Sequence, residues 1–186
     1  MKDENKFKNW HSRGFLPHCD RQGLTQFITF RLGDSLPVNI TTKLSRGKNS
    51  YTPELAKLLD NGLGSCMLKE ARNAEIVQDV LLNRDGIDYN LHAWSIMPNH
   101  VHTMLTPDRP LEIIIKAWKS VSSRLINNNS GGSIWYADYF DRYIRNESHY
   151  IETEFYIDVN PVKADLCRKP HEWIFSSAYS KYKIKL

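Results

Sequence analysis

Cysteine is scarce in this chain. Its three cysteines, Cys19, Cys66 and Cys167, are far apart, and the sequence contains no Cys-x-x-Cys pair. An odd number of isolated cysteines argues against a disulfide framework and against a structural zinc site. We therefore expect reduced thiols and a cytoplasmic protein.

Long apolar runs are also missing. The charged residues 1–6 are followed by no apolar stretch, so we expect neither a signal peptide nor a membrane span. The 186 residues, 41% hydrophobic and 25% charged, suit one globular domain over 1–186, with an irregular N-terminal arm (about 1–23) and a C-terminal tail (about 165–186). The net charge of +4 suits an acidic partner such as nucleic acid without requiring one.

The hydrophobic patterns predict alternating strands and helices. Alternation over residues 24–31 predicts a strand, and apolar residues at helical spacing predict helices. In chain order the pattern is strand, helix (in two runs), strand, strand, helix, short strand, helix. The predicted elements are strands in 24–31, 93–105 (two, with a break at Pro98-Asn99) and 139–144, and helices from Thr52, over 71–82, 111–127 and 149–159. This order predicts an α+β, ferredoxin-like (split βαβ) antiparallel sheet with helices on one face, which leaves the other face free for a site.

Two histidines open the strand that follows the Pro98-Asn99 break. Successive strand residues point to opposite faces, so His100 and His102 share one face while Val101 lies on the other. Two imidazoles at this spacing can chelate one divalent ion. The alternative is a polar strand face without a chemical role, and the spacing alone favours neither interpretation.

Tyr156 and Asn160 are four residues apart in a segment with helical character. At that spacing a phenol and an amide oxygen can point at one place. Each residue also has a simpler explanation. An asparagine before Pro161 is a common start of a new helix, which we favour from the sequence alone, and an isolated tyrosine is more often a half-buried aromatic than a nucleophile.

Several motifs occur together in one order along the chain. They are Gly14-Phe15-Leu16-Pro17-His18, Phe27-Ile28-Thr29-Phe30-Arg31-Leu32, Met97-Pro98-Asn99-His100-Val101-His102, Trp118-Lys119-Ser120, Tyr139-Phe140-Asp141-Arg142-Tyr143-Ile144-Arg145, His149, Tyr156-Ile157, Asn160-Pro161-Val162-Lys163-Ala164 and Trp173-x-x-Ser176-Ser177-Ala178. This ordered set resembles the REP-associated tyrosine transposases, in the HUH superfamily of single-strand DNA nucleases related to small insertion-sequence transposases. Two positions depart from the family pattern: Asp165 stands where glycine is usual, and Ile174 where proline is usual.

The resemblance implies a metal-dependent endonuclease and strand transferase. It makes Tyr156 the catalytic nucleophile that forms a 5′-phosphotyrosine, and His100, His102 and Asn160 the ligands of Mg²⁺ or Mn²⁺. Joining strands through a phosphotyrosine needs no ATP, which agrees with the absence of a Gly-x-x-x-x-Gly-Lys motif.

The implied partner is single-stranded or hairpin DNA of the repetitive extragenic palindrome type. The family is expected to act as a monomer, here in the cytoplasm and associated with the nucleoid. Basic residues near the motifs are the expected phosphate contacts: Lys119, Arg124, Arg142, Arg145 and Lys163. Two alternatives stay open, namely a hairpin-binding module with weak or no cleavage, and a hydrolase that activates water while Tyr156 is only structural.

Overall fold

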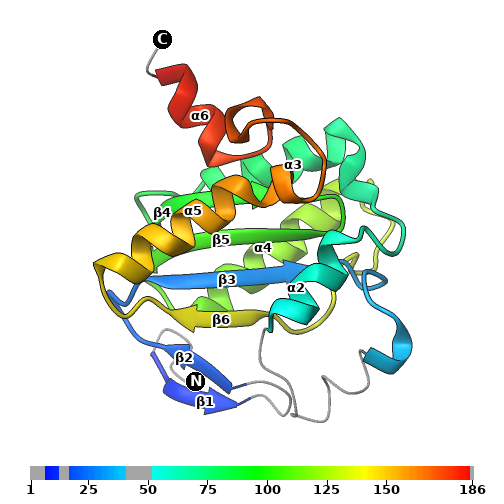
Figure 1. Ribbon diagram of the computed structural model, residues 1–186. Coiled ribbons are helices and arrows are strands. Elements are labelled where there is room, and N and C mark those ends of the chain that lie inside the picture. Colours follow the sequence, from blue (N-terminus) through cyan, green and yellow to red (C-terminus); the bar gives the residue numbers. More distant parts are fainter. Residues whose placement is uncertain (1–6, 13–16, 41–51, 185–186) are drawn as a thin grey trace.

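A four-stranded antiparallel sheet in the order β4-β5-β3-β6 forms the centre of the computed structural model, which describes residues 7–12, 17–40 and 52–184 (Figure 1). Its strands are β3 (Gln26–Arg31), β4 (Tyr89–Ile96), β5 (His100–Pro107) and β6 (Phe140–Tyr143). A smaller two-stranded sheet pairs β1 (Asn9–Ser12) with β2 (Pro17–Asp20), inside the region predicted as an irregular arm. Gly14 to Leu16 of the N-terminal motif lie outside the described residues.

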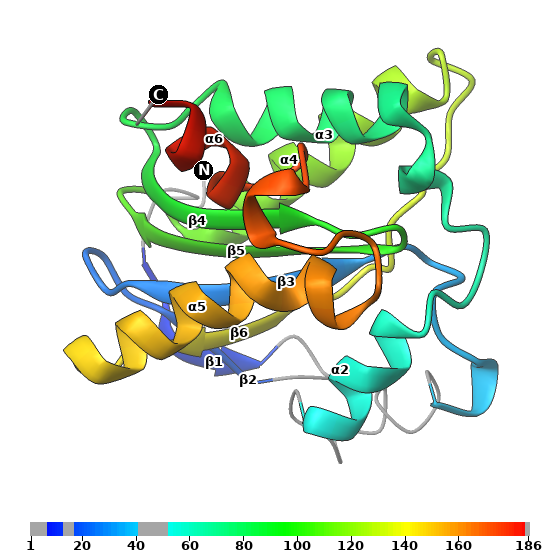
Figure 2. The ribbon, with the colours of Figure 1, turned by 45° about the horizontal axis from the view of Figure 1, so that its top comes forward.

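Helices pack on both faces of the sheet. The helices are α2 (Pro53–Asp60), α3 (Ala71–Leu82), α4 (Leu111–Ile126), α5 (Glu147–Lys163) and α6 (Ser177–Ile184), with 3₁₀ turns η1 (Met67–Lys69) and η2 (Pro170–Glu172). Figures 1 and 2 show α3 and α4 on one face, and α5 with α2 on the other. The predicted α+β class and element order are confirmed. The second face is not left free, because α5 lies across it. Among the described residues, no helix has both the length and the apolar character that a bilayer crossing requires.

Strand alternation divides the interior into two unequal parts. Val101 and Leu105 of β5 point into the main core beneath α3 and α4, where Trp118 is also buried. Met104, on the opposite face of β5, packs with Ile157 of α5 in a smaller cluster that also holds Phe27, Ala93 and Ile144. His100 and His102 have the same parity as Met104, so the strand directs both imidazoles towards α5.

α5 continues through Pro161, where the sequence favoured the start of a new helix. The helix is capped instead by Asn146, whose side chain accepts a hydrogen bond from the His149 backbone N–H (2.9 Å). The prediction that Asn160 is an N-cap is therefore wrong. Proline removes a hydrogen bond inside a helix, but α5 ends two residues later at Lys163, so little regular helix is disturbed.

His18 fixes the small sheet to β6. Its imidazole is fully buried between two carboxylates, with Nδ1 bonded to Asp141 and Nε2 lying 3.1 Å from Asp138. Burial alone would lower the pKa of His18, but the hydrogen bonds and charges of Asp138 and Asp141 outweigh burial and raise it to about 9. His18 therefore acts as a buried cation that joins β2 to the edge of the main sheet.

Candidate metal and nucleophile site

The structure brings the two histidines of β5 together. His100 and His102 are both fully buried, and their Nε2 atoms lie 3.0 Å apart. Pairing with β3 places His102 opposite Thr29 and His100 opposite Arg31. The predicted shared face of the two imidazoles is therefore present, deep beneath α5.

Hydrogen bonds at the other ring nitrogens orient both imidazoles. Asn99 donates its amide N–H to the Leu63 carbonyl (2.9 Å). Its oxygen, 2.7 Å from His100 Nδ1, must therefore accept a hydrogen bond from a protonated Nδ1. His102 Nδ1 lies 2.8 Å from the Thr29 hydroxyl, which can accept in the same way. With both Nδ1 atoms protonated, two Nε2 lone pairs face each other, the arrangement that ligand histidines take around a metal ion.

Burial keeps both imidazoles neutral. It lowers the pKa of His100 to about 3. The pKa of His102 falls well below its ordinary value, through burial and then through its neighbour His100. Because a metal ion binds only the unprotonated nitrogen, the neutral form is the one that a metal site needs.

Asp60 is a third candidate ligand, and the sequence analysis missed it. Its Oδ1 lies 3.6 Å from His100 Nε2, and one ligand atom from each of Asp60, His100 and His102 falls within 4.8 Å of the others. Oδ1 is buried without a hydrogen-bond partner among the described residues. Burial raises the pKa of the Asp60 carboxyl to about 6, against the opposing charge of Lys163. The sequence contained one indication of this role. A negative side chain at the C-terminal end of a helix is unfavourable, because that end of the helix dipole is also negative.

Asn160 adds a buried amide on the side of α5 that packs against the sheet. It is fully buried, and within the described part of the chain neither its Oδ1 nor its Nδ2 has a hydrogen-bond partner. An unsatisfied buried polar atom costs about 1–3 kcal/mol, so such a pair favours binding of a polar or cationic partner. Two imidazole nitrogens, one carboxylate oxygen and one amide oxygen form a donor set that suits a divalent cation.

Tyr156 lies beside this cluster. Its ring is partly buried and stands edge-on to His102 (5.4 Å between centroids) and to Phe27 (5.8 Å). The Lys163 ammonium lies 5.4 Å from the centre of the Tyr156 ring and also acts on the Asp60 charge. One helix face thus places a phenol, an ammonium and the Asn160 amide together.

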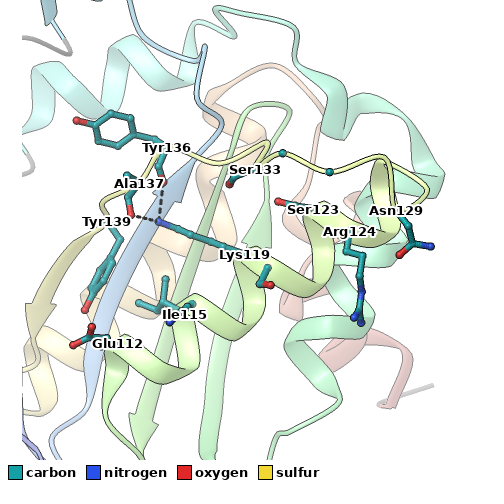
Figure 3. Close-up of a pocket in the computed structure, with 14 residues that line it drawn as sticks. Glu112, Ile115, Lys119, Ser123, Arg124, Asn129, Ser133, Tyr136, Ala137 and Tyr139 are labelled. Carbon is teal, nitrogen blue, oxygen red and sulfur yellow. Dashed lines mark hydrogen bonds between the residues drawn. The ribbon is translucent and has the colours of Figure 1, made fainter. Parts of the chain in front are cut away.

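The other predicted basic residues lie in two different places. Arg142 lines a cavity next to Tyr156, and Arg145 is exposed just before α5. Lys119 and Arg124 belong to α4, behind the sheet, around a pocket of about 810 Å³ (Figure 3). There the Lys119 ammonium is buried and donates to the carbonyls of Tyr136, Ala137 and Asp138 at 2.8–3.3 Å. The structure therefore gives Lys119 the role of anchoring the 136–138 loop, and Arg124 remains an exposed cation far from Tyr156.

Comparisons with known proteins agree with this geometry. Residues 69–160 match the family model described as "Transposase IS200 like", a range that includes His100, His102, Tyr156 and Asn160 but not Asp60. No curated protein matches the chain.

Solved structures also resemble the chain. One, described as a REP-associated tyrosine transposase bound to a REP hairpin, is similar at 17% identity and a TM-score of 0.61, over 88% of this chain and 81% of that one. Another, a putative transposase from Deinococcus radiodurans, has 19% identity and a TM-score of 0.38, over 81% of this chain and 96% of that one. The family match, with the fold it shares, shows that this chain belongs to the IS200-like transposases.

Proposed function

We propose that this transposase is a divalent-metal-dependent single-strand DNA endonuclease and strand transferase, with Tyr156 as its nucleophile. The observation that carries the proposal is the pair of facing Nε2 atoms beside the Tyr156 ring. The buried Asn160 amide and one buried oxygen of the partly buried Asp60, which lack hydrogen-bond partners among the described residues, complete it. We assign His100, His102, Asp60 and Asn160 as the metal ligands. Their mixture of nitrogen and hard oxygen donors suits Mg²⁺ or Mn²⁺.

The chain's own residues supply nucleophile and charge. The Tyr156 oxygen attacks the phosphorus, gives up its proton, and forms a P–O bond while the bond to the 3′ oxygen breaks and that oxygen takes up a proton. The bound ion would polarise the non-bridging oxygens of this phosphodiester. Lys163 lies close enough to the phenol ring to stabilise the negative charge that develops on its oxygen. The 3′ hydroxyl of another strand can reverse the step, which gives strand transfer.

A single chain suffices for this chemistry. The proposed ligands and Tyr156 lie within one protomer, with the His102 and Tyr156 rings 5.4 Å apart. No residue of a second copy is needed to bring nucleophile and metal together. We therefore propose that the protein acts as a monomer.

Hairpin DNA is the proposed partner. The structural relative is bound to a REP hairpin, and this chain shares its fold. Arg142, Arg145 and Lys163 are exposed on the face that carries Tyr156 and would contact phosphates there. Arg124, on the opposite face, would be reached only by DNA that extends around the molecule.

The test is a denaturing gel of the protein with labelled hairpin oligonucleotides and Mg²⁺ or Mn²⁺. The proposal predicts label bound covalently to the wild type, and none with a chelator or with Tyr156→Phe. Tyr150→Phe, which alters another partly buried tyrosine of α5, should still form the adduct. Cleavage that persists in Tyr156→Phe without an adduct would make water the nucleophile. Tight binding without cleavage would leave a hairpin-binding module.

A further inference from the structure

A cavity of about 300 Å³ adjoins Tyr156 on the side away from Asn160. It lies between α2, α5 and the edge of the sheet. Its walls include Phe27, Ala56, Arg142, His149, Glu152 and Tyr156. The family match over residues 69–160 includes the α5 residues of this cavity but not those of α2.

The cavity and the metal cluster are consecutive sites along the same two helices. On α2, Ala56 lines the cavity and Asp60 belongs to the metal cluster. On α5, Tyr156 lines the cavity and Asn160 is one turn further on. Four helical residues span about 6 Å. A phosphodiester held at the cluster therefore has a neighbouring nucleoside within reach of the cavity.

The volume and the aromatic walls suit one unpaired base. A site of this size is at the small end of ligand pockets, enough for one nucleoside but not for a duplex. Phe27 and Tyr156 offer ring surface to a base, and Arg142 offers a cation to its phosphate.

Polar groups on the walls favour some bases over others. His149 Nδ1 accepts the Arg145 backbone N–H (3.2 Å), which leaves the proton of the neutral ring on Nε2. Glu152 is exposed and supplies two acceptor oxygens. A carboxylate pairs well with the two adjacent N–H groups of guanine, whereas both carbonyl oxygens of thymine repel it.

We propose that this cavity binds the unpaired base next to the scissile phosphodiester, and that Glu152 makes it prefer guanine and disfavour thymine. This inference rests on the proposed function, because it takes Tyr156 as the point of attack. It adds a base-specific site that involves residues of α2, β3, β6 and α5.

The experiment measures binding without cleavage. Tyr156→Phe protein is titrated, by fluorescence anisotropy, with hairpin oligonucleotides in which each unpaired flanking nucleotide in turn is abasic. We expect one position at which the abasic change weakens binding about 5- to 100-fold, as loss of base stacking does. At that position guanine should bind at least about 5-fold more tightly than thymine, the size of a good base-edge contact.

The Glu152→Gln change, added to the same background, tests the assigned residue. It should abolish the preference for guanine over thymine, while Glu154→Gln, two residues along the same helix, should keep it. Equal binding of all abasic variants, or a guanine preference unchanged by Glu152→Gln in a protein with normal thermal unfolding, would overturn the inference. Because no cleavage is measured, base selection can hold even if the nuclease proposal fails, and the gel experiment can succeed even if base selection fails.

Discussion

The two faces of the sheet differ in what their buried residues do. On the α3–α4 face, alternate residues of β5 such as Val101 and Leu105 join a large apolar core. On the α5 face, His100 and His102 of the same strand are just as deeply buried, but lie among polar groups of which several lack partners in the described part of the chain. One face thus gains stability by burial. The other leaves buried polar groups without partners in the described residues, which costs stability and is what the proposed metal site would require.

The largest effect should come from the apolar face. Trp118→Ala removes a buried ring that packs against Phe30 and donates a hydrogen bond to the Tyr89 hydroxyl (3.0 Å). We expect the free energy of unfolding to fall by about 3–5 kcal/mol, as large-to-small core changes do. Chemical denaturation would measure it, and a loss below about 1 kcal/mol would remove the distinction between the faces.

The polar face should respond in metal binding more than in stability. His102→Ala deletes one of the two proposed imidazole ligands. We expect Mn²⁺ affinity to fall by at least about 100-fold, more than the loss of a residue that only orients a ligand costs. Titration followed by electron paramagnetic resonance would measure the affinity. His92→Ala, a histidine of β4 that lies outside the cluster, should bind Mn²⁺ like the wild type. Equal affinities of the two variants would contradict the assignment.

His18 allows a test of how the small sheet is attached to the edge of the main sheet. Its pKa is raised from 6.5 to about 9 in the folded state, so its stabilisation is fully present below pH 6.5 and is lost as pH rises through 9. The difference between these two pKa values corresponds to about 3 kcal/mol in the free energy of unfolding. Denaturation curves at several pH values should show this loss in the wild type and a flatter profile in His18→Gln. Parallel profiles would show that the buried cation contributes nothing.

The smallest expected effect comes from Asp60, whose replacement should raise the stability of the metal-free protein and lower its affinity for Mn²⁺. Asp60→Asn replaces a partly buried carboxylate whose Oδ1 has no hydrogen-bond partner among the described residues. Without metal we therefore expect the protein to gain about 1–2 kcal/mol at pH 8. Its Mn²⁺ affinity should fall, because a neutral amide is a weaker ligand. Glu75→Gln, an exposed acid on α3, should change neither quantity. A metal-free Asp60→Asn protein that is less stable than the wild type would show that the carboxylate has a structural role instead.

Local patterns predicted much of this molecule. Strand alternation placed His100 and His102 on one face, and helical spacing placed Tyr156 one turn before Asn160, as the structure has them. These relations depend on residues close in sequence, whose geometry follows from the strand or helix alone.

Long-range packing explains what the sequence did not reveal. Asp60 meets His100 across 40 residues. Its place at the C-terminal end of a helix marks it as unusual, but the sequence around it does not identify His100 as its partner. Lys119 looked like a surface cation, but the loop that buries it begins 17 residues later. Asn160 followed by Pro161 is a sequence typical of a helix start. The packing of α5 against β4 and β5 outweighs this local preference, so the helix continues through both residues.

The most direct test of the account is to locate the covalent bond. Wild-type protein is incubated with a hairpin oligonucleotide and Mn²⁺, digested with nuclease and protease, and its peptides are analysed by mass spectrometry. We predict a nucleotide attached to the peptide that contains Tyr156, absent when the ion is chelated. Attachment at another residue, or cleaved DNA with no modified peptide, would contradict the role of Tyr156 as the nucleophile.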